Sequence, residues 1–182
     1  MMRIVTGTAR GTKLQTLEGE ATRPTSERTK ESVFSMLQFD IEGRRVLDLF
    51  GGSGQMGLEA LSRGAASATI VDSSPEAVKI IKANAQKTKL YDKCVILTKD
   101  YKAYLKGTKE KFDIIFLDPP YDSNMLSEAM RIIIDGDMLN YMGVVVLESG
   151  NDDIPEYGEL TLRRHYKSGR AYVTVLVNEV EK

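Results

Sequence analysis

From residue 44 onward, short apolar runs alternate with longer amphipathic segments. The run Arg45–Phe50 (RVLDLF) and the run Ala68–Asp72 (ATIVD) are typical of strands. Three more runs of the same kind follow at Val95–Leu97, Phe112–Leu117 and Val144–Leu147. Each run is nearly continuous in apolar residues, which indicates parallel strands covered on both faces.

The segments between these runs carry helix signals. Leu58–Arg63 continues as a helix after a glycine-rich turn. A further helix is predicted to begin near Pro75, because two serines precede this proline and a glutamate follows it. Val78, Ile81 and Ala85 then recur at helical spacing. This alternation predicts an α/β fold with a doubly wound, mostly parallel sheet and right-handed crossovers.

The pattern changes at both ends of the chain. Leu160–Tyr166 and Ala171–Asn178 are predicted strands separated by four residues, too few for a helical crossover, so we expect a C-terminal antiparallel hairpin. Before residue 40 we expect a small extension with short strands at Arg3–Thr6 and Lys13–Leu17. A helix is predicted over Glu27–Leu37, which places three apolar residues on one face.

Composition limits the protein class without identifying a function. A chain of 182 residues, 42% hydrophobic and 28% charged, suits one globular domain with a small appendage. Cys94 is the only cysteine, which excludes an internal disulfide and a cysteine-rich zinc site, and we see no metal-ligand pattern. With neither a signal peptide nor a membrane-length apolar run, we expect a cytoplasmic protein without a membrane partner. The net charge of −1 means that a polyanion would need a local basic surface.

A glycine-rich turn follows the first strand. The run GSGQMG, residues 52–57, matches G-x-G-x-x-G, and in an open parallel sheet this turn lies at the edge where ligands bind. Asp72 ends the next strand about 20 residues later, where an acid commonly binds ribose hydroxyls. These features fit NAD. A tight turn with no ligand is the alternative, because the glycine motif alone is weak evidence.

Asp48 favours a different cofactor. It lies inside the first strand, where a dinucleotide-binding strand is usually apolar, and a buried carboxylate is costly unless it is paired. Hydrogen bonds from its own loop amides would be one solution, but a cationic ligand is a better partner. S-adenosylmethionine carries an ammonium and a sulfonium, and no pyrophosphate. The run DLFGGSG, residues 48–54, is similar to the first motif of class I methyltransferases, which binds that cofactor.

The stretch Asp118-Pro119-Pro120-Tyr121 follows the apolar strand FDIIFL, again at the ligand edge. It resembles the fourth motif of methyltransferases that modify exocyclic amino groups of nucleobases. Such an amine is a poor nucleophile because its lone pair is delocalised into the ring. If Asp118 and the Pro119 carbonyl each accept one N–H, the nitrogen is drawn toward a pyramidal form, while Tyr121 stacks on the base. A simple strand-ending turn is the alternative.

More segments extend this resemblance along nearly the whole chain. They are Arg23-Pro24-Thr25, ESVFSML at residues 31–37, GLEA at 57–60 and SRGA at 62–65. With DPPY they resemble the RsmD family, which methylates the amino group (N2) of a guanine in small-subunit (16S) ribosomal RNA. The resemblance implies a class I, Rossmann-like fold. It also implies an S-adenosylmethionine-dependent methyltransferase domain, which we place over residues 41–182. Residues 1–40 carry basic side chains and the R-P-T stretch, and the α/β core does not need them, so we expect them to form an RNA-binding or lid extension.

The resemblance also implies a binding partner, and other functions stay open beside it. The partner is ribosomal RNA or a small-subunit assembly particle. DPPY suits an adenine-N6 methyltransferase acting on DNA or RNA equally well, although DNA enzymes generally need an added recognition region. An NAD-dependent oxidoreductase would leave Asp48 and DPPY unexplained, and a binding module without catalysis would not need DPPY.

Individual residues follow from these motifs. The catalytic candidates are Asp118, Pro119, Pro120 and Tyr121. The cofactor-binding candidates are Asp48, Phe50, Gly51, Gly52, Ser53, Gly54, Asp72, Ser73, Asp100 and Tyr101, of which the last two match the position that contacts the adenine. The RNA-binding candidates are Arg3, Arg10, Lys13, Arg23, Pro24, Thr25 and Arg28, together with Lys30. The C-terminal arginines and the lysine-rich stretch from Lys79 to Lys111 are a second possible RNA surface.

Overall fold

The computed structural model of the protein describes residues 1–18, 26–120 and 124–182. Within them, strands form one sheet, and their bounds are β1 Arg45–Asp48, β2 Ser67–Asp72, β3 Cys94–Thr98, β4 Phe112–Leu117, β5 Leu139–Ser149, β6 Thr161–Ser168 and β7 Ala171–Val177. The order is β3-β2-β1-β4-β5-β7-β6, with the first five strands parallel. β7 pairs antiparallel with both β5 and β6. The predicted, mostly parallel sheet with a C-terminal hairpin is therefore confirmed.

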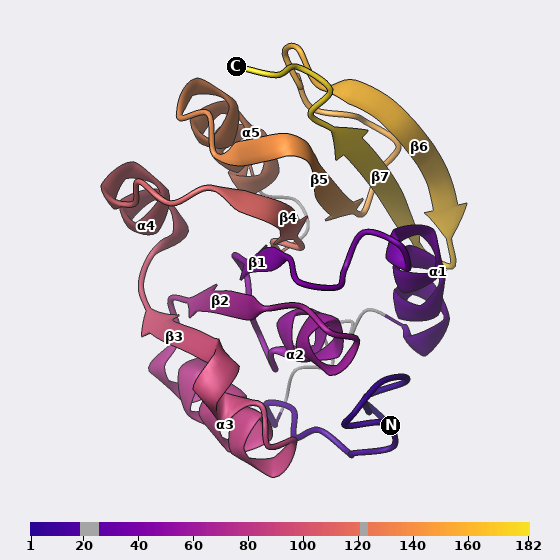
Figure 1. The fold of residues 1–182 in the computed structure, drawn as a ribbon, viewed down its shortest axis with the longest axis vertical. Helices are drawn as coiled ribbons and strands as arrows, with labels where there is room; N and C mark the ends of the chain where they lie inside the picture. The colour runs from indigo at the N-terminus through magenta and orange to yellow at the C-terminus, as the bar shows by residue number, and fades with distance from the viewer. Residues whose placement is uncertain (19–25, 121–123) are drawn as a thin grey trace.

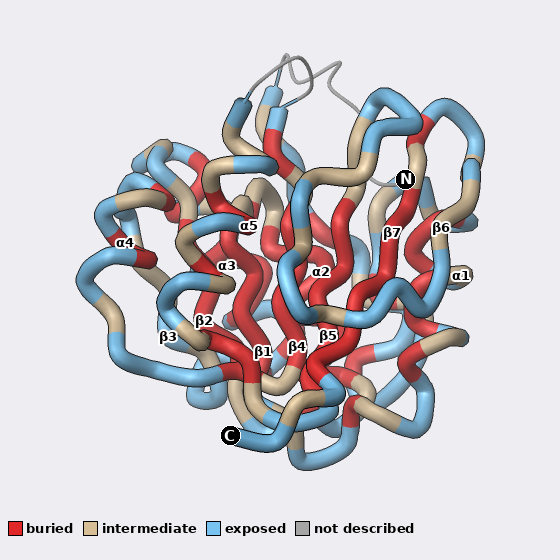
Figure 2. The backbone as a smooth tube through the Cα atoms, turned by 90° about the horizontal axis from the view of Figure 1, so that it is seen from above, coloured by how far each residue is buried: buried red, intermediate tan, exposed pale blue. Residues whose placement is uncertain are grey.

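Helices cover both faces of this sheet. Their bounds are α1 Glu27–Leu37, α2 Gln55–Ser62, α3 Pro75–Lys87, α4 Tyr101–Gly107 and α5 Met125–Asp135, with a short 3-10 turn at Tyr91–Lys93. The first three helices bury their apolar residues in one core against one face, while α4 and α5 build a second core on the other (Figure 1). Figure 2 shows that the buried residues concentrate in the central strands. Of the described helices, none is long and apolar enough to cross a bilayer.

Helix α1 has the bounds that the sequence predicts. The Ser26 hydroxyl accepts the Thr29 amide at 3.1 Å and so caps the first turn. Val33, Phe34 and Leu37 are buried on one face, and the Phe34 ring lies 5.6 Å from that of Phe116 on β4. Apolar spacing and the serine cap together explain why this segment is helical and where it docks.

The prediction of two short strands before residue 18 is wrong. Only an isolated bridge between Arg3 and Lys13 forms, because the intervening chain turns sharply. Gly7 lies at φ 91°, and a Cβ there would fall 1.8 Å from the Ser62 carbonyl oxygen on α2. Only glycine permits that approach. Ile4 and Leu14 are buried in the same core as α1 and α2, so this segment packs as part of the main fold.

Strand β3 differs from its prediction. It is an edge strand, and the Val95 side chain is 52% exposed, whereas we expected both faces to be covered. Helix α3 contacts β3 on one face. The prediction failed because a short apolar run looks the same at the edge of a sheet and at its centre.

Candidate active site

The candidate site lies where the strand order reverses. β1 has β2 on one side and β4 on the other, with Asp48 in register with both Ile70 and Phe116. The carboxyl ends of parallel strands share an edge of the sheet, so the glycine loop after β1 and the stretch after β4 lie next to each other. The fold therefore brings together the glycine motif and the DPPY stretch, which are far apart in the sequence.

The glycine loop is tied to the end of β2. Gly54, the N-cap residue just before α2, adopts φ 81°, a conformation that favours glycine. The Gly52 amide donates to one carboxylate oxygen of Asp72 at 2.9 Å, and the Ser74 amide donates to the other at 2.9 Å. The structure thus places Asp72 beside the loop, as expected for a ribose-binding acid, while Ser73 is exposed next to it.

Asp48 is a buried carboxyl group at the end of β1. Its exposed fraction is 4%, and one of its oxygens accepts the Gly57 amide of α2 at 3.0 Å. Burial, with a smaller effect from the nearby Asp72 carboxylate, raises the pKa of Asp48 to about 7, although the Gly57 hydrogen bond opposes this rise. A cation bound beside Asp48 would favour its ionised form. The Gly57 contact is a backbone-amide hydrogen bond, which resembles the alternative considered for Asp48 in the sequence analysis, and a cationic partner stays a prediction.

The remaining cofactor candidates make contacts within the protein. The Tyr101 ring lies 5.3 Å from that of Phe50, and its hydroxyl donates to Glu128 at 2.5 Å. Burial, followed by the Glu128 hydrogen bond, raises the pKa of Tyr101, so the hydroxyl stays protonated. The Asp100 carboxylate accepts two amides at the start of α4 and caps that helix. Ser53 donates to the Met2 sulfur at 2.9 Å. Whether these residues bind a cofactor stays a prediction.

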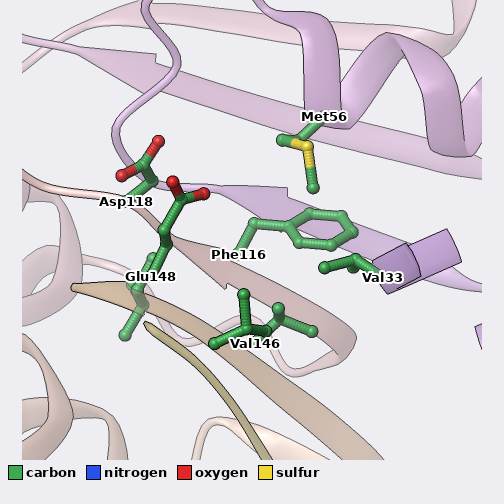
Figure 3. A pocket seen from close by; sticks show the side chains of 8 residues that line it. Val33, Met56, Phe116, Asp118, Val146 and Glu148 are labelled. Carbon is green, nitrogen blue, oxygen red and sulfur yellow. The ribbon is translucent and has the colours of Figure 1, made fainter. Parts of the chain in front are cut away.

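A pocket opens beside Asp118. Figure 3 shows the Asp118 and Glu148 carboxylates side by side at one end and apolar side chains at the other. Its lining comes from α1, α2, β4, β5 and β7, and consists of Val33, Met56, Phe116, Leu117, Asp118, Val146, Glu148 and Val173. Pro119 is buried and Pro120 is exposed, whereas Tyr121 lies outside the described residues.

Glu148 lines the pocket, and the sequence analysis missed it. Leu117 is in register with Leu147, so the residues that follow them, Asp118 and Glu148, lie next to each other at the ligand edge. The signal was present in the sequence, because a polar residue directly follows the apolar run VVVL. Recognising it required the pairing of β4 with β5.

Of the predicted RNA-binding residues that the structure describes, one is buried and another forms an ion pair. Arg10, Lys13 and Arg28 are exposed, and Arg3 is exposed but forms an ion pair with Glu27 at 2.8 Å. Lys30 is wrong as an RNA contact. Its exposed fraction is 1%, and its ammonium lies 3.4 Å from the Glu59 carboxylate. Arg23, Pro24 and Thr25 lie outside the described residues.

Lys30 belongs to a buried polar cluster that we define as Lys30, Glu59 and Arg63. The Glu59 side chain is fully buried and accepts the Val5 and Thr6 amides at 2.9 and 3.0 Å. It also accepts from Arg63, one helical turn later, at 3.0 Å, and Lys30 donates to the Arg3 carbonyl at 2.5 Å. This cluster joins α1, α2 and the N-terminal segment on the face of the sheet that carries the pocket.

Comparison with known proteins gives a consistent result. A family model described as conserved hypothetical protein 95 matches residues 2–177. The YlbH protein of Bacillus subtilis is 34% identical over 179 residues, which cover 96% of this chain and 97% of that protein. Ribosomal RNA small subunit methyltransferase D of Haemophilus influenzae is 32% identical over 154 residues, covering 83% of this chain and 80% of that protein.

Solved structures agree with these relatives. The yhhF protein of Escherichia coli superposes with a TM-score of 0.87 at 28% identity, covering 99% of each chain. An RNA methyltransferase from Salinibacter ruber, solved with S-adenosyl-L-homocysteine, gives a TM-score of 0.68 at 17% identity over 88% of this chain and 96% of that one, a likeness of fold alone. The predicted class I, Rossmann-like fold is confirmed. As its motifs predict, the chain belongs to the RsmD family, whose curated members include proteins named ribosomal RNA small subunit methyltransferase D.

Proposed function

We propose that this protein transfers a methyl group from S-adenosylmethionine to the exocyclic N2 amino group of a guanine in small-subunit ribosomal RNA. One observation carries the proposal. In a chain of this family, Asp118 and Pro119 directly follow β4 and lie beside the glycine loop that follows β1. An acceptor amine held by Asp118 would therefore lie next to the cofactor loop.

The residues around the glycine loop suit S-adenosylmethionine. Asp48 is a buried carboxyl group whose raised pKa would fall on meeting a cationic ligand. The Asp72 carboxylate, held at the end of β2 by two amides, is placed to accept ribose hydroxyls. When bound, this cofactor supplies a methyl group on a positively charged sulfur. NAD suits the site less well, because its pyrophosphate would approach the buried Asp48.

The chain's own groups orient the acceptor. Asp118 is half-buried at the strand end, and its carboxylate accepts one N–H of the amine. The Pro119 carbonyl accepts the other N–H, and the proline rings stiffen the backbone that carries it. Together they direct the nitrogen lone pair at the methyl group, and Asp118 receives the proton as the nitrogen gains positive charge. Cytoplasmic ribosomal RNA, free or in an assembly particle, is the proposed partner, and the base must be unpaired or flipped out.

Asp118→Ala tests this proposal. We expect methyl transfer to fall by about 10²- to 10⁴-fold, because the amine loses its acceptor, while the affinity for S-adenosylmethionine stays within about twofold of wild type. Transfer of a radiolabelled methyl group to small-subunit particles from cells lacking the gene measures the first quantity, and calorimetry measures the second. Asp135→Ala, on the exposed end of α5, is the matched control.

The alternative is methylation of adenine N6, for which an Asp-Pro-Pro-Tyr stretch is equally suited. Digestion of the labelled RNA to nucleosides, followed by mass spectrometry, separates the two. N2-methylguanosine supports the proposal, and N6-methyladenosine would replace it. Near-normal turnover by Asp118→Ala would remove Asp118 from the mechanism whichever base is modified.

A further inference from the structure

Glu148 lies next to Asp118 and points to the same side of the sheet. Ile114 and Phe116 on β4, like Val144 and Val146 on β5, bury their side chains in the core beneath α1 and α2. Side chains alternate along a strand, so the next residues on that face are Asp118 and Glu148. Figure 3 shows their carboxylates side by side at the end of the pocket.

The proposed mechanism uses Asp118 and leaves Glu148 without a role. Glu148 lines the same pocket as Asp118, so a second carboxyl group borders the place proposed for the base. Two carboxylates next to each other suit a ligand that presents two N–H donors side by side, because an ionised carboxylate only accepts hydrogen bonds. The Watson–Crick edge of guanine presents such a pair, since its N1–H lies next to the N2 amino group. Adenine has an unprotonated N1, which would face the carboxylate with a lone pair.

We infer that Glu148 is a specificity residue that accepts the N1–H of the target guanine while Asp118 and the Pro119 carbonyl hold its N2 amino group. This inference rests on the proposed function. An ionised carboxylate only accepts hydrogen bonds, so this site rejects a base that presents an acceptor at N1. Phe116, Val146 and Met56, which line the rest of the pocket, carry no hydrogen-bond donor, so they cannot compensate a mismatch at N1.

The test replaces the target guanine by 2-aminopurine, which keeps the amino group at C2 but has an unprotonated N1. The modified nucleotide is first mapped with the wild-type enzyme on small-subunit particles. Particles are then reconstituted with ribosomal RNA that carries guanine or 2-aminopurine at that position. Initial rates of methyl transfer give kcat/KM for each particle. We expect wild type to prefer guanine roughly 10- to 100-fold, the effect of one charge-assisted hydrogen bond.

Glu148→Gln should remove the preference for guanine over 2-aminopurine, and a general loss of activity is not the expected effect. The glutamine amide donates to an unprotonated N1 as readily as its carbonyl accepts from N1–H. We expect the variant to methylate the two particles with rates within about threefold of each other, the loss of one charge-assisted hydrogen bond. Glu42→Gln, exposed before β1 at the opposite edge of the sheet, should keep the wild-type preference. Calorimetry with S-adenosylmethionine checks that both variants are folded.

The outcomes separate this inference from the function on which it rests. Methylation of guanine with an unchanged preference in Glu148→Gln would overturn the role of Glu148 and leave the proposed function intact. Equal use of guanine and 2-aminopurine by wild type would do the same. Methylation of adenine in place of guanine by wild type would overturn both. A merely structural role for Glu148 would lower both rates together, which also contradicts the inference.

Discussion

Asp48 combines deep burial with a position beside the glycine loop, and the two together make its ionisation sensitive to a ligand. Its pKa of about 7 means that the free protein holds this carboxyl group largely protonated in mild acid. The ammonium of S-adenosylmethionine would favour the ionised form, so binding below pH 7 must release a proton. We therefore expect cofactor affinity to rise roughly tenfold between pH 5.5 and 7.

Calorimetry in two buffers of different ionisation enthalpy measures both the affinity and the proton release. Asp48→Asn should bind the cofactor weakly and lose most of this pH dependence. An affinity of the wild-type protein that does not change over this range would show that Asp48 does not face a cationic group.

The same shift bears on stability. The pKa of Asp48 is about 7 in the folded protein and 3.8 in the unfolded chain. The contribution of Asp48 to stability is therefore fully present below pH 3.8 and is lost progressively as the pH rises from 3.8 to about 7. Relative to wild type, Asp48→Asn should therefore gain stability between pH 5 and 8. Urea denaturation of the cofactor-free proteins at both pH values gives the two differences in free energy of unfolding. If the difference in free energy of unfolding between Asp48→Asn and wild type is the same at pH 5 and pH 8, the raised pKa of Asp48 is contradicted.

At the scale of elements, the cluster of Lys30, Glu59 and Arg63 connects α1 and α2 with the N-terminal segment. Burial lowers the pKa of Lys30, and the Glu59 carboxylate opposes this effect. Glu59→Ala would leave a buried ammonium uncompensated and two backbone amides without their acceptor. We expect it to lower the free energy of unfolding by about 3–5 kcal/mol, measured by urea denaturation.

A second variant shows whether charge is the cause. Lys30→Met combined with Glu59→Gln removes both fully buried charges. It should be more stable than Glu59→Ala, because the only cation that loses its carboxylate partner is Arg63, whose side chain reaches solvent. Glu156→Ala, on the exposed loop before β6, provides the surface control. A loss below about 1 kcal/mol for Glu59→Ala would mean that water or neighbouring groups replace its contacts.

Local signals explain which elements the sequence could predict. Helix α1 and strand β4 have their predicted bounds, because a serine cap and a continuous apolar run are local features. Helices α4 and α5 were not predicted, and Asp100, which caps α4, was interpreted only as a cofactor contact. The N-terminal contacts were missed because Glu59 lies more than 50 residues from the amides it binds.

In the candidate site, too, residues next to local motifs could be predicted, whereas residues placed by long-range contacts could not. Asp48, Asp72 and Asp118 stand at strand ends next to recognisable motifs, so the sequence alone indicates a shared edge of the sheet. Glu148 carries no motif of its own, and its place beside Asp118 depends on strand pairing. Lys30 was misassigned because a lysine among other basic residues looks exposed until its buried partner is known.

For the molecule as a whole, the first 40 residues and the α/β sheet share one core. Ile4, Leu14 and Phe34 are buried together with residues of β1, β4 and β5. A boundary near residue 40 stays a prediction, but removal of the N-terminal segment would expose apolar surface and destabilise the fold. The proposed RNA contacts must therefore be tested by changing exposed side chains and not by truncation.

Arg10, Lys13 and Arg28 are the exposed basic residues of this region that the structure describes without an ion-pair partner among the described residues. Arg28 lies on α1, which also supplies Val33 to the pocket, and the N-terminal segment reaches the glycine loop through Asn84, whose side chain bonds both Gln15 and Ser53. We predict that these three basic residues contact RNA phosphates.

Changing all three residues to glutamine should weaken RNA binding and reduce its salt dependence. Each phosphate contact contributes about 0.7 to the slope of log Kd against log salt for single strands, so the triple variant should lose about 2 from that slope. Filter binding of small-subunit ribosomal RNA from 50 to 300 mM KCl (roughly the range over which such slopes are read) measures this slope.

A control variant changes Lys106, Lys109 and Arg131 to glutamine. It removes the same charge from the opposite face, where α4 and α5 lie (Figure 1). Cofactor affinity should stay at the wild-type value in both variants. Equal slopes for the two variants would mean that net charge alone acts, and the RNA surface would then have to be sought among the C-terminal arginines of β6.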